Sequence, residues 1–280
     1  MPLDVAIYGI HGHKRSSMCC QAMYAGIRAA GDRPRLFMEA DYRVPEHDLA
    51  VFYGYTQILR RVMADYIKAG RKAVYIDLGY WDREGMRGHH KIVVNARHPT
   101  AYFDRKPQDG YRAGKLGVKA EPWRKADGHI LLAGMGEKAA EAEGQKVEKF
   151  EYWAIAEIRK ITDREIVYRP KPSWIQARKI AGTIHSPKAQ PLAEVLANCH
   201  AVVTHHSNVA VEGLCAGVPA FCWGGVAAGL SSQDLSDIER PYYPEGRSNW
   251  INAISYTQWN IDEMTRGLPW RHLKSEGLIP

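Results

Sequence analysis

Three polar side chains in the last third of the chain have types and spacing that suit anion binding. Ser207 and Asn208 follow a short β-branched run ending at Thr204, and either can cap a helix that runs to Cys215. A helix that begins directly after a strand has free backbone N–H groups, and these donors and the helix dipole favour a phosphate. Glu212 lies one turn further on, where a carboxylate can accept hydrogen bonds from ribose hydroxyls. The spacing therefore suits a nucleotide diphosphate.

The residues around this motif predict a strand, a helix and a second strand. Residues 201–204 form the first strand, Gly217 can end the helix, and Pro219 opens another apolar run. The alternative is an ordinary strand–helix–strand unit in which the serine, asparagine and glycine residues only cap the helix. That alternative does not require Glu212 or the Gly-x-Pro exit, so we favour the nucleotide site.

The stretch 202–221 also resembles a family signature. From Glu212 onward it has the Glu-x-x-x-x-Gly-x-Pro spacing of the sugar-nucleotide helix in GT-B glycosyltransferases and UDP-N-acetylglucosamine 2-epimerases. The similarity is weaker from Ile166 onward and almost absent before residue 80. The resemblance implies an α/β protein with two Rossmann-like domains facing a cleft, the GT-B architecture. It also implies that the donor substrate is a UDP-sugar, with UDP-glucose as the first candidate.

Other residues of the second half are candidates for the same donor site. Residues 128–136 predict a strand that runs into a Gly-rich turn, which in GT-B enzymes approaches the diphosphate. Residues 166–172 predict a strand entering a rigid turn, which resembles the Arg-Pro-x-Pro turn of epimerase-like proteins, where basic residues lie by the phosphates. The alternative is a plain strand exit with surface charge. The predicted donor-binding residues are Gly134, Gly136, Arg169, Lys171, His206, Ser207, Asn208 and Glu212.

The first half of the chain alternates short apolar runs with helical patterns. This order predicts a parallel sheet, with ligands bound at the carboxyl ends of its strands. The predicted strands are 5–8, 36–38, 49–53 and 73–78, and the predicted helices run from Ser16 or Ser17 to Ala30 and from Thr56 to Ala69.

Three residues of this half are candidates for a catalytic base. His11 and His13 directly follow the first strand, and imidazole can accept a proton from a hydroxyl near neutral pH. Some inverting GT-B enzymes resemble this arrangement. Asp77 ends the fourth strand and is the competing base. The alternatives are that the histidines hydrogen-bond loop backbone and that Asp77 caps the next turn.

The basic residues are concentrated in one segment. The chain has a formal net charge of +7, and residues 83–125 alone contain eleven Lys or Arg against four acids. Such a segment, with interspersed aromatic residues, is typical of a surface that binds a polyanion. The alternative is that this charge serves the donor diphosphate. The predicted DNA-binding residues are Arg97, Arg105, Lys106, Arg112, Lys115 and Trp123.

These observations predict a glycosyltransferase. The basic segment suggests double-stranded DNA as acceptor, with 5-hydroxymethylcytosine as the hydroxyl-bearing base extruded from the duplex. The overall pattern also resembles glycosyltransferase-like proteins encoded by tailed phages. Two rivals stay open: an epimerase or a glycosyltransferase for a small or polysaccharide acceptor, and a non-catalytic DNA-binding protein on a GT-B scaffold.

Length and composition set the remaining expectations. The 280 residues predict an acceptor domain (1–125, with the basic insertion 80–125), a nucleotide-sugar domain (126–245) and C-terminal helices that cross back (246–280). Five cysteines without paired spacing argue against a disulfide framework or a zinc ribbon, and no metal is predicted. No apolar run approaches the roughly 20 residues that cross a membrane, so we expect a cytoplasmic protein without a membrane partner. For a phage protein this would be the host cytoplasm.

Overall fold

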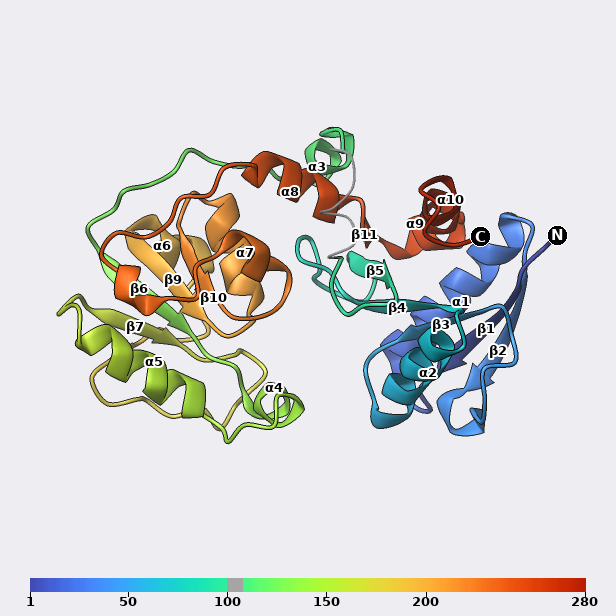
Figure 1. Ribbon diagram of the computed structural model, residues 1–280, viewed down its shortest axis with the longest axis horizontal. Helices are drawn as coiled ribbons and strands as arrows, with labels where there is room; N and C mark the ends of the chain where they lie inside the picture. The colour runs from blue at the N-terminus through green and yellow to red at the C-terminus, as the bar shows by residue number, and fades with distance from the viewer. Residues whose placement is uncertain (100–107) are drawn as a thin grey trace. The chain divides into compact units, whose positions relative to one another are not determined.

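The structure, a computed structural model, describes residues 1–99 and 108–280, and the chain divides into two units (Figure 1). Unit 1 comprises residues 1–116 and 252–280, and unit 2 comprises residues 117–251. Residues 117–125 belong to unit 2 because their backbone pairs with it. The Glu121 N–H donates to the Cys215 carbonyl at 2.9 Å, and the Arg124 N–H donates to the Gly217 carbonyl at 2.7 Å.

Unit 1 is built on a six-stranded sheet of order β11-β5-β4-β3-β1-β2. Strands β1 to β4 are parallel, β5 is antiparallel to β4, and β11 is antiparallel to β5. The central strands β1, β3 and β4 are almost continuous apolar runs, as expected where both faces of a sheet are covered. The strands are β1 (Asp4–Gly9), β2 (Arg33–Met38), β3 (Leu49–Tyr53), β4 (Lys72–Leu78), β5 (His90–Val94) and β11 (Gln258–Trp259).

Helices cover both faces of this sheet. Helix α2 (Gln57–Lys68) packs its apolar stripe on one face, through Leu59, Val62 and Tyr66. Helix α1 (Lys14–Ala29) packs on the other face together with the C-terminal helices α9 (Ile261–Thr265) and α10 (Leu268–Ser275). The short elements η1 (Glu39–Asp41) and α3 (Tyr111–Lys115) complete the unit.

The C-terminal helices lie directly against α1 (Figure 1). Gly26 allows this approach, because a Cβ atom there would overlap the carbonyl oxygen of Met264. Asp32 secures the same junction: it accepts a hydrogen bond from the Trp270 indole at 2.7 Å and pairs with Lys274 at 2.6 Å. The end of the chain is therefore part of the unit 1 core.

Unit 2 is built on a five-stranded parallel sheet of order β10-β9-β6-β7-β8. Its strands are β6 (His129–Ala133), β7 (Ile166–Arg169), β8 (Ile184–His185), β9 (Cys199–Thr204) and β10 (Ala220–Cys222). Its helices are α4 (Glu137–Ala142), α5 (Lys149–Arg159), α6 (Leu192–Ala197), α7 (Asn208–Cys215), η3 (Val226–Leu230) and η4 (Leu235–Asp237). Helix α8 (Arg247–Ser255) begins in unit 2 and ends in unit 1.

The predicted α/β class with two Rossmann-like units is confirmed, and so is the parallel order of β1 to β4. The strands β8 and β11 were not predicted, because two residues carry no periodicity. The predicted start of the first helix at Ser16 or Ser17 is wrong. Helix α1 begins earlier, at Lys14, and Ser16 is buried with its Oγ accepting the Ile10 N–H at 3.0 Å.

We expect Gly26→Ala to lower the free energy of unfolding by about 1–3 kcal/mol, because the added Cβ meets backbone atoms that cannot rotate away. Urea denaturation would measure the change. Gly114→Ala in α3 is the control, since no atom lies within 4 Å of its new Cβ. Equal stability of the two variants would contradict the packing of α9 against α1.

Candidate functional site

The strand order of unit 2 reverses between β6 and β9. From β6 the chain proceeds to β7 and β8 on one side, and from β9 it proceeds to β10 on the other. Ligands of open α/β sheets bind at such a switch point, beyond the carboxyl ends of the strands. The two strand ends are linked, since the Thr204 hydroxyl donates to the Ala133 carbonyl at 2.8 Å and accepts the Ser207 N–H at 3.3 Å. We call the residues 133–136 and 204–208 the switch-point site.

Helix α7 begins at this site. Ser207 is its N-cap, and the Ser207 Oγ accepts the Val209 N–H at 3.3 Å, as the sequence predicts. Gly213 lets the helix lie close to β9, because a Cβ there would be 2.9 Å from a Val202 methyl group. The positive end of α7 therefore faces the switch point, with Asn208 in the first turn and Glu212 one turn along.

Arg169 ends β7 beside the switch point. Its guanidinium donates to the Ser186 hydroxyl and to the Gln190 carbonyl, both at 2.9 Å. Burial lowers the pKa of Arg169, and the negative charge of Glu212 opposes this shift. Two of the predicted donor-binding residues from separate elements are therefore within electrostatic reach of each other.

The remaining predicted donor-binding residues lie on the loops of this edge. Gly136 has a left-handed φ of +76° and starts α4, and a Cβ there would be 3.2 Å from the Lys171 side chain. His206 follows His205, and their Nδ1 atoms are 2.8 Å apart. The Gly134 N–H donates to a backbone carbonyl of β7 at 3.0 Å, which joins the loop to the neighbouring strand.

The base candidates lie at the carboxyl edge of the unit 1 sheet. His13 is the N-cap of α1, and its Nδ1 accepts the Ser16 N–H at 3.1 Å. Asp77 Oδ2 accepts the Tyr75 hydroxyl at 2.7 Å, and Oδ1 accepts the Leu78 N–H at 2.8 Å. His11 is exposed in the turn after β1, and no described residue hydrogen-bonds its ring.

Two further residues at this edge had no predicted role. Lys91 is buried 4.0 Å from Asp77, and burial lowers the pKa of its ammonium to about 8 while Asp77 opposes the shift. His90 is also buried, which lowers its pKa to about 4, and the nearby Arg15 adds to the effect. They lie beside the end of β4 because β5 pairs with it in antiparallel register, and no residue pattern signals that orientation.

The predicted DNA-binding residues that the structure describes have partners within the protein. Arg112 is buried, ion-pairs with Glu263 at 2.6 Å and lies 4.1 Å over the Trp259 ring. Lys115 pairs with the same carboxylate at 2.7 Å. The Trp123 ring is covered by the Arg247 guanidinium at 3.8 Å.

The charge surplus of residues 83–125 is partly offset by acids outside that segment. Arg97 lies 4.8 Å over the Tyr55 ring, whereas Arg105 and Lys106 lie outside the described residues. Among the residues that the structure describes, the ion pairs to outside acids are Arg87 with Asp262, Lys91 with Asp77, and Arg112 and Lys115 with Glu263. A net charge counted over a sequence window therefore overstates the field that this segment presents.

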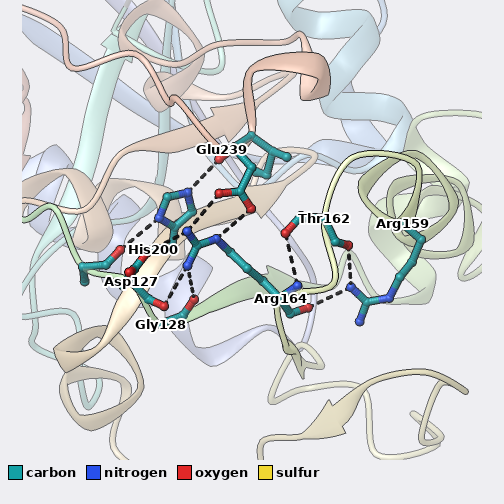
Figure 2. A network of polar contacts seen from close by, with 9 residues as sticks. Asp127, Gly128, Arg159, Thr162, Arg164, His200 and Glu239 are labelled. Atoms are coloured by element: carbon teal, nitrogen blue, oxygen red, sulfur yellow. Dashed lines mark hydrogen bonds and ion pairs between the residues drawn. The ribbon is translucent and has the colours of Figure 1, made fainter.

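Figure 2 shows a polar cluster at the opposite edge of the unit 2 sheet, where β6 and β9 begin. Arg164 pairs with Asp127 and Glu239, each at 2.8 Å, and the hydrogen bond from Arg164 lowers the pKa of Glu239 to about 2. The His200 ring nitrogens lie 2.9 and 2.7 Å from two backbone carbonyl oxygens. A shallow cavity of about 350 Å³ borders this cluster. Because its charges already pair with one another, we assign the cluster a structural role.

Comparisons with known proteins establish the fold. No protein-family model and no curated protein matches the chain. Two solved structures of Thermosulfurimonas dismutans KpsC are similar to it. The β-Kdo 2,7-transferase has a TM-score of 0.58 at 12% identity and covers 96% of this chain and 99% of its own. The β-Kdo 2,4-transferase has a TM-score of 0.57 at 12% identity and covers 95% and 98%.

At this identity the likeness concerns the fold alone, and it supports the predicted GT-B type of α/β fold. A UDP-GlcNAc 2-epimerase of Methanocaldococcus jannaschii has a TM-score of only 0.36 at 10% identity, which is too low to support the epimerase hypothesis. It covers 98% of this chain and 100% of its own. No helix in the described ranges is long and apolar enough to span a bilayer, and no three potential metal ligands cluster among these residues.

We expect Glu263→Gln to destabilise the protein by about 3–5 kcal/mol at pH 7, because it leaves the buried Arg112 without its counter-charge. Burial alone would raise the pKa of Glu263, but the hydrogen bonds from Arg112 and Lys115 outweigh burial and lower it from 4.5 to about 2. The stability from this group is therefore present above pH 4.5 and is lost as the pH falls toward 2.

Urea denaturation at several pH values would measure both effects, and the variant should lose stability less steeply than the wild type between pH 4.5 and 2. Asp262→Asn is the matched control, since its carboxylate is exposed and pairs with Arg87, which is also exposed. If both substitutions cost the same small amount, the buried ion pair does not hold α3 to α9.

Proposed function

We propose that this chain is a glycosyltransferase that binds a nucleotide-activated sugar at the switch-point site and transfers the sugar to a hydroxyl acceptor. The observation that carries the proposal is the start of α7 at the switch point, with Arg169 and Glu212 in electrostatic reach of each other. The fold shared with two transferases of the sugar Kdo supports it. UDP-glucose is the first donor to test.

The residues of unit 2 suit the leaving group. Negative charge grows on the diphosphate as the glycosidic bond to the donor breaks, and fixed donors aimed at that charge lower the barrier. The positive end of the α7 dipole and the cationic side chains of Arg169 and Lys171 can supply this stabilisation. Glu212 would accept hydrogen bonds from the ribose hydroxyls, because a carboxylate would repel the phosphates.

Among the three base candidates the hydrogen bonds favour His11. In His13, Nδ1 accepts a backbone N–H, so the neutral ring carries its proton on Nε2 and has no free acceptor nitrogen. Asp77 already accepts hydrogen bonds on both carboxylate oxygens and lies 4.0 Å from the Lys91 ammonium, so its oxygens are engaged within the protein. We propose that His11 takes the proton from the hydroxyl of the acceptor substrate. Asp77, through its hydrogen bonds, keeps the carboxyl edge of the unit 1 sheet ordered.

We expect His11→Ala to lower kcat by about 10²–10⁴-fold with little change in donor affinity, as for the loss of a general base. His13→Asn is the matched variant, because asparagine keeps the N-cap of α1 while the imidazole is removed, and it should retain most activity. Steady-state kinetics with donor titration would separate the two. The reverse result would assign the base to His13.

The acceptor hydroxyl has two candidates. The first is a hydroxyl of another saccharide, which the fold shared with the Kdo transferases supports. The second is 5-hydroxymethylcytosine in phage DNA, which the formal net charge of +7 supports. The ion pairs of Arg112 and Lys115 weaken the second candidate, since these cations are already neutralised within unit 1.

Mass spectrometry of reaction products tests the function. The protein would be incubated with a panel of sugar nucleotides and, in parallel, with oligosaccharides, hydroxymethylcytosine DNA or hydroxymethyluracil DNA. We expect a gain of one sugar mass on one acceptor, and its loss in Glu212→Ala through lost donor binding. Conversion of the sugar nucleotide without any acceptor would indicate an epimerase. Salt-sensitive DNA binding with the nucleotide left intact would indicate a DNA-binding protein.

A further inference from the structure

Glu151 of α5 is a buried carboxylate that is only half satisfied. Its side chain is 1% exposed, and Oε1 accepts the Met135 N–H in the switch-point site at 2.8 Å. Oε2 is buried, and no described residue donates a hydrogen bond to it. Burying a carboxylate oxygen without a donor is unfavourable, so its retention here calls for a donor supplied by another molecule.

Tyr168 of β7 provides a second polar group at the same place. Its side chain is fully buried, and its hydroxyl has no hydrogen-bond partner among the described residues. Both groups border Gly134, because a Cβ there would lie 3.0 Å from Glu151 Oε1 and 3.1 Å from the Tyr168 hydroxyl. Burial raises the pKa of Tyr168 and the Glu151 charge adds to it, so the hydroxyl stays protonated and can donate.

The chemistry of this pair excludes the phosphates of a nucleotide. A carboxylate repels an anion, and the anion-binding groups of the site are elsewhere, at the start of α7 and on Arg169. The carboxylate oxygen needs an uncharged N–H or O–H group that donates to it, and the neighbouring hydroxyl needs an acceptor. A ligand that fits this pair therefore carries a donor next to an acceptor. A nucleobase edge and a pair of sugar hydroxyls both have that pattern.

We propose that Glu151 Oε2, together with the Tyr168 hydroxyl, binds an uncharged N–H or O–H group of the nucleotide sugar. The inference rests on the proposed donor site. It adds Glu151 as a residue that hydrogen-bonds to the uncharged part of the nucleotide sugar. Glu151 thereby has two tasks: Oε1 holds the Met135 amide, which fixes the loop 134–136, and Oε2 contacts the ligand.

Glu151→Gln tests the proposal because stability and binding should change in opposite directions. The glutamine carbonyl can still accept the Met135 N–H, and its amide can donate to Tyr168, so the melting temperature should stay the same or rise. Affinity should fall at least tenfold for the best bound of UDP, UDP-glucose, GDP and CMP, measured by calorimetry. Affinity for inorganic pyrophosphate should not change.

Two further variants sharpen the test. Tyr168→Phe removes the second polar group and should act in the same direction as Glu151→Gln. Glu157→Gln is the control on the same helix, since its carboxylate is partly exposed and pairs with Lys160, and it should change neither stability nor binding appreciably. A fall in affinity for UDP as well as UDP-glucose would place the donor group on the nucleoside, whereas a fall for UDP-glucose alone would place it on the sugar.

Two outcomes would overturn the proposal. The first is that the Glu151→Gln variant binds every probe with the same affinity as the wild type. The second is that Glu151→Gln has a lower melting temperature and loses as much affinity for pyrophosphate as for the nucleotides. That result would make Glu151 a purely structural residue. A wild-type protein that binds none of the nucleotides would refute the donor site itself, and the role of Glu151 with it.

Discussion

Parallel strands end at one edge of a sheet, and the candidate donor site depends on that constraint. In unit 2 the strand order reverses between β6 and β9, so the chain leaves these two neighbouring strands in opposite directions along the sheet. The loop after β6 and the first turn of α7 therefore share one place, although some 70 residues separate them. The bond from Thr204 to the Ala133 carbonyl links the two strand ends.

The edge that results has two chemically different sides. The start of α7 and Arg169 bring positive charge to one side, which suits phosphates. Glu151 and Tyr168 present a carboxylate oxygen and a hydroxyl, which suit uncharged donors. A sugar nucleotide carries both kinds of group, so a site of this composition matches the whole molecule better than it matches a free phosphate or a simple polyanion.

The basic segment illustrates how tertiary structure changes the meaning of a local charge count. Arg112 and Lys115 converge on Glu263, about 150 residues away in sequence, and the Trp259 ring covers the Arg112 guanidinium. Two of the cations that suggested a polyanion partner thus hold α3 to the C-terminal helices. Charge on a surface depends on which acids fold against it, and a linear window cannot include those acids.

The sequence by itself determined the elements and the main site motif. Periodicity predicted the parallel strands, because a buried strand needs an apolar run, and the serine and glycine positions predicted both ends of α7, because caps are local. Only the tertiary structure decided the neighbours. The antiparallel orientation of β5 put His90 and Lys91 beside Asp77, and the approach of α5 to Gly134 put Glu151 beside the loop that follows β6. Those outcomes arise from contacts between distant residues, whose energies no local pattern records.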